Sequence, residues 1–86
     1  MKTIWKFSLY TDNVQQIEMP GLSHVLCFQK QDGEICIWAE VNDELPKVTR
    51  TFKIVMTGEE LPDEDLRYIG TVQDGAFVWH LFEIIL

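Results

Sequence analysis

Basic residues in this acidic chain are concentrated at one place, between positions 47 and 53. Lys47, Arg50 and Lys53 lie there, with the hydroxyl of Thr49 among them. Lys and Arg are the side chains that most often bind phosphate and carboxylate groups, and Arg can do so with two parallel hydrogen bonds. This segment is therefore our first candidate for a binding site, with a small anionic, nucleotide-like ligand as the expected occupant.

Aromatic and histidine side chains could complete such a site. Trp38 or Tyr68 would offer a face on which a base stacks, whereas the alternative for Trp38 is a place in the core. His80 shares a predicted strand face with Val78 and Phe82, so a core or interface histidine is the alternative to a ligand contact. The candidate ligand-binding residues are thus Arg50, Lys47, Thr49, Trp38, Tyr68 and His80.

Arg50 itself has two candidate partners. Alternation along residues 49–56 places it on the same strand face as Phe52, Ile54 and Met56. A guanidinium at the end of an apolar row has to be paired, because an unpaired buried charge is strongly unfavourable. The partner is either a ligand phosphate or a carboxylate within the chain, and the sequence leaves both open.

The inventory for catalysis or metal binding is small. The histidines are His24 and His80, and the cysteines are Cys27 and Cys36. They show no metal-ligand spacing, and the chain contains no glycine-rich phosphate loop. We therefore expect a protein that is not an enzyme and that needs no metal or cofactor. The two cysteines fall diagonally on one predicted sheet face, which suits packed thiols better than a disulfide.

The composition indicates a single folded domain over residues 1–86. The chain is 47% hydrophobic and 12% aromatic, which excludes disorder. Its 14 acidic and 7 basic residues give a net charge of −7, which argues against a duplex nucleic acid as partner. No signal-peptide pattern and no apolar run of roughly 20 residues is present, so we expect a cytoplasmic protein without a membrane partner.

An acidic run spans residues 59–65 and carries five carboxylates around Leu61 and Pro62. Such a run is usually a solvated loop, and its spacing lacks the alternating ligands of a calcium loop. The alternative is a surface that imitates a phosphate backbone or holds a cation. We expect a loop.

An Asp-Gly pair at residues 32–33 predicts a β-hairpin. A type I′ turn needs positive φ at both turn residues, and this pair favours it. The turn sets Phe28 opposite Ile37 and Leu26 opposite Ala39. The predicted core face of this hairpin comprises Leu26, Phe28, Ile35, Ile37, Ala39 and Val41.

A second Asp-Gly pair, at residues 74–75, predicts another hairpin of the same kind near the end of the chain. Its turn sets Val72 opposite Phe77 and Gly70 opposite Trp79. A large ring opposite a strand glycine covers exposed backbone, which supports this register.

Alternating patterns predict further strands over residues 3–10, 14–19 and 49–56. The turn residues 11–13 would join the first two as an opening hairpin. No segment carries a helical apolar stripe. We therefore predict an all-β fold, an antiparallel meander of about seven short strands packed as a sandwich or partly closed barrel.

The final strand suggests self-association. Phe82, Ile84, Ile85 and Leu86 exceed what one side of a small core can absorb. An exposed apolar strand invites edge pairing, so we expect a homo-oligomer that covers it.

Several segments spread along nearly the whole chain read, in order, MKTIWKF, IEMP, CIWA, PKVTRTF, YIGT and FVWHLFE. In this order they resemble a family of small phage and bacterial proteins of unknown function. The family brings no established catalytic residues, so the resemblance implies a phage or prophage origin rather than a mechanism. Small oligomeric phage proteins of similar size often counter host defence, some by sequestering nucleotide immune signals.

Three functions follow as expectations. The first is a phage-type, non-enzymatic binding protein that sequesters a small anionic nucleotide signal in the host cytoplasm. The second is an inhibitor whose acidic surface docks a basic host defence protein. The third is a structural or accessory phage protein.

Overall fold

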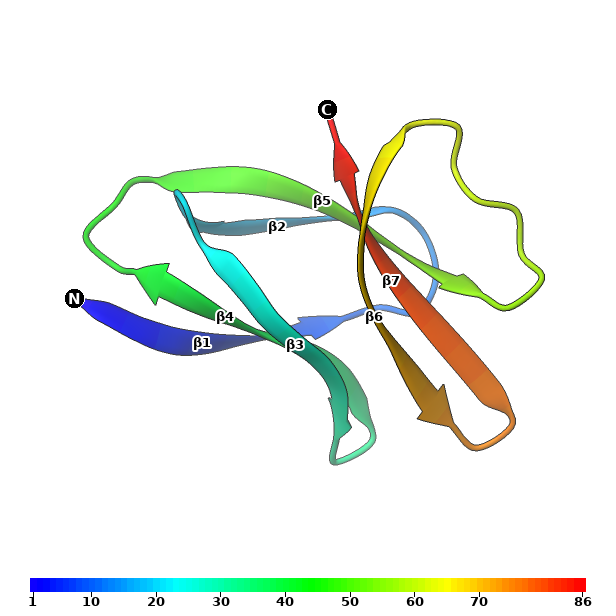
Figure 1. The fold of residues 1–86 in the computed structure, drawn as a ribbon. Coiled ribbons are helices and arrows are strands. Elements are labelled where there is room, and N and C mark those ends of the chain that lie inside the picture. The colour runs from blue at the N-terminus through cyan, green and yellow to red at the C-terminus, as the bar shows by residue number, and fades with distance from the viewer.

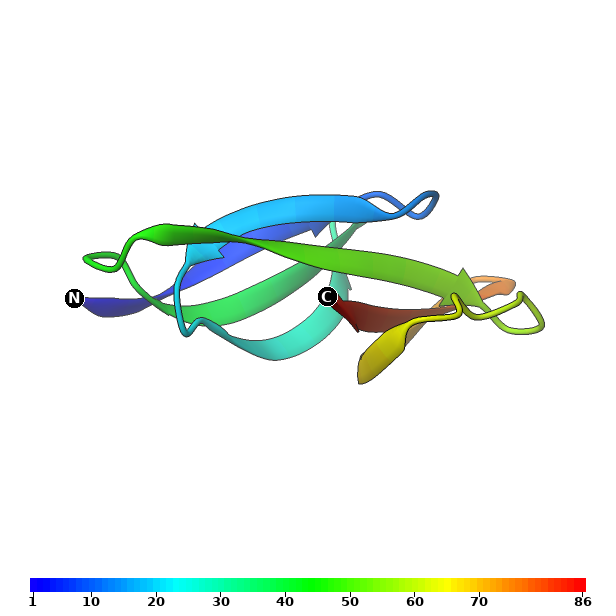
Figure 2. The ribbon, with the colours of Figure 1, turned by 90° about the horizontal axis from the view of Figure 1, so that it is seen from above.

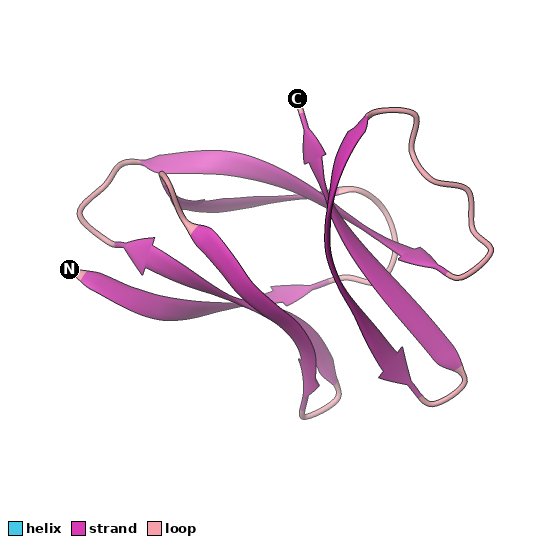
Figure 3. Ribbon diagram, in the orientation of Figure 1, coloured by secondary structure: helices cyan, strands magenta, loops and turns pink.

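The computed structural model describes residues 1–86, which form strands and loops and no helix (Figure 3). The strands build two antiparallel sheets, of three strands in the order β1-β4-β3 and of four in the order β2-β5-β7-β6 (Figure 1). The sheets pack as a sandwich that does not close into a barrel, which confirms the predicted fold class. The strands are β1 (Lys2–Leu9), β2 (Gln15–Pro20), β3 (His24–Gln31), β4 (Glu34–Asn42), β5 (Lys47–Met56), β6 (Asp65–Asp74) and β7 (Phe77–Ile85).

The chain crosses repeatedly between the two sheets, so its path is more complex than a simple meander. The predicted opening hairpin is wrong, because β1 pairs with β4 and β2 pairs with β5. Residues 10–14 lead from one sheet to the other (Figure 2). The side-chain amide of Gln15 holds this turn by bonding both the N–H and the C=O of Tyr10. Placing β1 and β2 in facing sheets lets Leu9 and Met19 enter one core.

The β3-β4 hairpin has the predicted turn. Residues 32–33 have φ values of +50° and +81°, as a type I′ turn requires. Phe28 lies opposite Ile37, as predicted. Nearer the start of β3, a β-bulge at Leu26 makes the observed register differ from the predicted one. Val25 rather than Leu26 lies opposite Ala39, and Leu26 is 46% exposed. The extra residue moves Leu26 off the predicted core face and turns Val25 toward the core.

The β6-β7 hairpin differs from its predicted register. The turn falls on Gly75 and Ala76, one residue later than expected. Trp79 therefore lies opposite Val72 and not opposite Gly70. Gly75 has a φ of +60° and occupies the first turn position, which is the place that a type II′ turn reserves for glycine.

The core lies between the sheets and receives side chains from every strand. On β5 the predicted row is buried at Phe52 and Ile54, whereas Met56, at the strand end, is 38% exposed. Complete burial of a side chain such as Phe52 or Ile54 contributes roughly 1.5–3 kcal/mol of transfer free energy to folding. The core residues are Leu9, Met19, Phe28, Ile35, Ile37, Phe52, Ile54, Val72 and Leu81.

The final strand lies inside its sheet. β7 pairs with β5 on one side and with β6 on the other, so both of its edges are covered within the chain. Ile84 is buried, and the ring of Phe82 meets that of Tyr68 edge to face at 5.6 Å. Self-association of the chain stays a prediction. The chain forms no helix of the length and apolarity that a membrane crossing requires.

The remaining sequence predictions concern a loop and two thiols. Residues 59–64 of the acidic run lie in the connection between β5 and β6, as expected of a solvated loop, and Asp65 begins β6. The Glu59 carboxylate in it accepts a hydrogen bond from the backbone N–H of Met56, which lowers the pKa of Glu59. Cys27 is exposed, Cys36 is buried, and the two are not linked.

Candidate functional site

Arg50 is paired with a carboxylate of the same chain. Its Nε lies 2.7 Å from Oε2 of Glu83, and its Nη2 lies 2.8 Å from Oε1. Nη1 donates a third hydrogen bond, of 2.6 Å, to the backbone carbonyl of Ser23. The Arg50 and Glu83 side chains keep only 15% and 8% of their exposure, so the pair is largely withdrawn from water. Of the two partners considered for Arg50, the structure contains the internal carboxylate.

The strand register explains this pair. Glu83 on β7 lies opposite Phe52 on β5. Arg50 is two residues before Phe52 in the same strand, so the two side chains lie on the same face of the sheet. Both charged side chains therefore project from the inner face of the four-stranded sheet, where the sandwich core ends. The guanidinium carbon of Arg50 lies 6.0 Å from the centre of the Phe52 ring. The face predicted for Arg50 is confirmed.

Three other sequence candidates come from both sheets of the sandwich. Lys47 and Thr49 are exposed at the start of β5, where they pair with residues of β2. Trp38 is half-buried in the three-stranded sheet, opposite Lys6 of β1. Its strand neighbour Ile37 is fully buried, so Trp38 is on the outer face of that sheet. Thr49 and Arg50 line one open cleft of about 230 Å³ together with Glu83, whereas Lys47 and Trp38 lie outside it.

Tyr68 and His80 belong to a hydrogen-bonded row on the outer face of the four-stranded sheet. The Nε2 atom of His80 is 2.8 Å from the Thr57 hydroxyl, and its Nδ1 atom is 3.0 Å from the Thr71 hydroxyl. The Thr71 hydroxyl also bonds the Tyr68 hydroxyl. Both nitrogens of His80 therefore have partners within the chain, and His80 lies on the outer face of the sheet rather than in the core.

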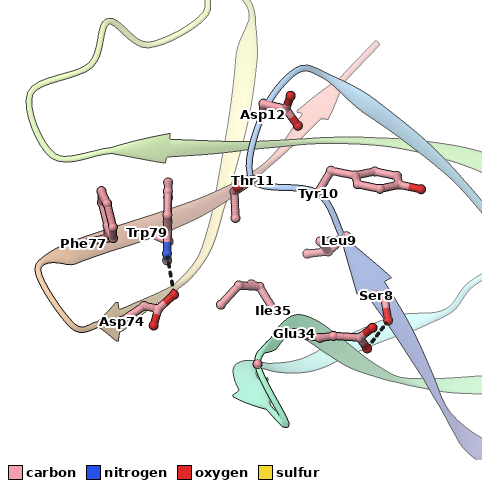
Figure 4. Close-up of a pocket in the computed structure, with 11 residues that line it drawn as sticks. Ser8, Leu9, Tyr10, Thr11, Asp12, Glu34, Ile35, Asp74, Phe77 and Trp79 are labelled. Carbon is pink, nitrogen blue, oxygen red and sulfur yellow. Dashed lines mark hydrogen bonds between the residues drawn. The ribbon is translucent and has the colours of Figure 1, made fainter.

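The largest cleft lies at one end of the sandwich, where the β3-β4 turn, the β6-β7 turn and residues 10–14 meet (Figure 4). Its volume is about 600 Å³. Leu9 and Ile35 lie between its two sides and supply an apolar floor. A concave site with an apolar floor and a few polar groups is the usual form of a binding site.

The polar lining of this cleft is anionic. Asp12, Glu34 and Asp74 contribute carboxylates, and no Lys, Arg or His lines the cleft. Glu34 accepts a hydrogen bond of 3.1 Å from the Ser8 hydroxyl. The Nζ atom of Lys30 reaches Asp74 at 2.6 Å. Asp12 and Glu34 have no basic partner, so this acidic cleft carries uncompensated negative charge.

Asp74 is kept ionised by its neighbours. The Lys30 ammonium donates one hydrogen bond to it, and the indole N–H of Trp79 donates another at 3.4 Å. These two donors lower the pKa of Asp74 below its ordinary value, with Lys30 having the larger effect. Because the folded-state pKa is lowered, the contact stabilises the fold at neutral pH and is lost as the pH falls through the lowered pKa.

Two aromatic rings of β7 form the remaining wall of the acidic cleft. Phe77 and Trp79 stack at 5.3 Å between ring centres, with 17° between their planes (Figure 4). Phe77 is 50% exposed, so part of this stack is open to a ligand. The face of an aromatic ring attracts cations and apolar stems alike. The acidic cleft therefore suits an organic cation.

Comparison with known proteins adds a family but no activity. A family model with the description Domain of unknown function (DUF7352) matches residues 1–85. The chain belongs to this family. No curated protein and no solved structure matches this DUF7352 chain. The predicted membership of a family of unknown function is confirmed, whereas the phage origin stays a prediction.

Sequence reasoning missed the acidic cleft of this DUF7352 domain. Its lining comes from three separate connections, and their meeting depends on which sheet each strand joins. One signal was present, since both Asp-Gly turns end at this side of the sandwich, but the role of Asp74 as a lining residue required the correct β6-β7 register.

Proposed function

We propose that the protein is a non-enzymatic binding protein that receives a lysine or arginine side chain of a basic partner protein in the acidic cleft. The observation that carries this proposal is the combination of two unpaired carboxylates, Asp12 and Glu34, with a half-exposed aromatic stack in one cleft of about 600 Å³. This is the second of the functions expected from the sequence.

Each part of a long basic side chain finds a complement in the cleft. The aliphatic stem would pack on Leu9 and Ile35 while the charged head stays at the rim, as such side chains commonly do. The head would bond Asp12 or Glu34, and hydrogen bonds to charged groups contribute about 1.5–3 kcal/mol each. The open face of Phe77 would add a cation–π contact.

The charge of the whole chain supports the same partner class. A net charge of −7 attracts basic proteins over distances of about a Debye length and speeds their association at low salt. The same charge repels polyanions. If the chain is phage-encoded, a basic host defence protein is the expected partner, and inhibition of that protein is the expected effect.

The nucleotide role expected from residues 47–53 receives less support. Two edges of the Arg50 guanidinium are occupied by Glu83 and by the Ser23 carbonyl. Lys47 and Thr49 lie apart from the aromatic candidates. We therefore place the partner-binding proposal first.

Removing the two unpaired cleft carboxylates should weaken the binding of a basic peptide. We expect Asp12→Asn with Glu34→Gln to reduce the affinity for a short oligoarginine peptide by at least roughly tenfold, because two charge-assisted contacts are lost. Isothermal titration calorimetry at physiological ionic strength measures the change. The matched control, Glu60→Gln with Asp63→Asn, removes the same charge from the exposed loop between β5 and β6. Equal losses in both variants would show general attraction and contradict the proposal.

Removing the exposed ring tests the aromatic wall at constant charge. Phe77→Ala should reduce the affinity for the same peptide by about threefold, which corresponds to the loss of a partly exposed cation–π contact of roughly 0.5–1 kcal/mol. The matched control is Tyr10→Ala, since Tyr10 is 74% exposed at the other side of the cleft and its ring points away from the aromatic stack (Figure 4). A larger loss in the Tyr10 variant would place the cation elsewhere.

A further inference from the structure

A second, smaller cleft lies at the opposite end of β6 from the acidic cleft. It forms where the start of β3 meets the start of β6, and its volume is about 170 Å³. Arg50, Arg67, His24 and Glu83 line it. This volume is several times the roughly 30 Å³ that a water molecule occupies in the liquid, so it suits a phosphate group but not a whole nucleotide.

The charges around this cleft leave one guanidinium free to bind. Glu83 is committed to Arg50 by two short hydrogen bonds. The side chain of Arg67 is 67% exposed, its guanidinium makes no hydrogen bond, and it reaches Glu83 only at 4.0 Å. Two guanidinium groups therefore face one carboxylate, which leaves a local excess of one positive charge in a chain of net charge −7.

The neighbouring groups hold this site in shape. Three hydrogen bonds, two to Glu83 and one to the Ser23 carbonyl, fix Arg50 in place, so the Arg50–Glu83 ion pair forms a rigid floor. His24 is exposed at the rim and offers a ring nitrogen. An anion that enters this cleft can bond the unpaired guanidinium of Arg67 without breaking a hydrogen bond within the protein. The free-energy cost of binding is therefore lower.

We infer that this cleft binds a phosphate group, with Arg67 as the principal ligand and His24 as a second donor. The planar guanidinium of Arg67 donates hydrogen bonds to two phosphate oxygens, and the N–H groups of Arg50 that bond neither Glu83 nor Ser23 are available as further donors. The inference stands apart from the proposed function, because the two clefts share no residue. It also moves the anion site expected from the sequence away from Lys47 and Thr49.

Titration with phosphate compounds tests the inference. Inorganic phosphate and AMP are titrated separately at low ionic strength, with binding followed by 31P NMR and by chemical shifts of the His24 ring. We expect binding in the millimolar range or tighter. Equal affinities would identify the phosphate group alone as the ligand, and tighter binding of AMP would identify a nucleotide whose remaining part lies on the adjacent surface. Binding of neither compound at about 10 mM would overturn the inference.

A pair of charge-matched variants locates the site. Arg67→Gln should reduce the affinity by at least roughly tenfold, since the free guanidinium is lost. Lys47→Gln removes one positive charge from the exposed start of β5 and should change the affinity less than about twofold. Both side chains are exposed, so neither change should disturb folding. A greater loss in Lys47→Gln than in Arg67→Gln would overturn the inference and favour the segment at residues 47–53.

Discussion

Replacing Arg50 with alanine should lower the free energy of unfolding by about 3 kcal/mol, the lower end of the range for a broken buried ion pair. The loss arises because Glu83, with 8% of its side chain exposed, would keep its charge without the two hydrogen bonds that compensate its burial. For a domain of this size that loss lowers the melting temperature by roughly 12–24 °C. Urea unfolding followed by tryptophan fluorescence measures the free energy directly.

Two further variants separate this effect from a general loss of charge. Lys30→Ala breaks the exposed pair with Asp74 and should barely move the urea midpoint, because solvent screens such contacts. Arg50→Met combined with Glu83→Leu should recover much of the stability lost in Arg50→Ala, since no unpaired charge remains. If Arg50→Ala proves no more costly than Lys30→Ala, the ion pair does not contribute as its burial implies.

Replacing Phe52 with alanine should cost about 3–5 kcal/mol, the largest effect that we expect from one substitution. Phe52 is completely buried at the centre of the core and also lies beside the Arg50 guanidinium. Its removal takes away apolar contacts with both sheets and leaves a cavity that the surrounding strands can fill only in part. Urea unfolding of the variant, at temperatures low enough to retain a folded baseline, provides the measurement.

The matched control for Phe52 is the same change at Phe77. That ring is 50% exposed, so its truncation removes less buried area and opens no internal cavity. Phe77→Ala should therefore cost less than about 1.5 kcal/mol. Similar losses in the two variants would mean that the sandwich core is not packed around Phe52 as the structure has it.

The sequence predicted the strands better than their partners. The β3-β4 hairpin was predictable because its turn residues and its alternation agree locally. The bulge at Leu26 was not, because both Val25 and Leu26 are apolar and either could face the core. The later turn was placed one residue early, since glycine serves the second position of a type I′ turn and the first of a type II′ turn.

Long-range pairing limited the prediction of the site. Alternation placed Arg50 on the inner face, but its partner Glu83 is 33 residues away and became identifiable only through the β5-β7 register. The residues that line the two clefts are likewise brought together by the pairing of strands that are distant in the sequence. Arg67 and Asp74 lie at opposite ends of β6, and neither belongs to a local motif that marks a ligand.

The position of β7 has a consequence for how the protein folds during synthesis. β7 follows β6 in the chain but lies between β5 and β6, so β6 has no neighbour, and β5 has only β2, until β7 has left the ribosome. Until then β5, with its row of buried side chains, presents an unpaired edge, which is the kind of surface that promotes aggregation. Of the four-stranded sheet only the β2-β5 pair can form earlier, and completion of the sheet waits for the insertion of β7 between β5 and β6.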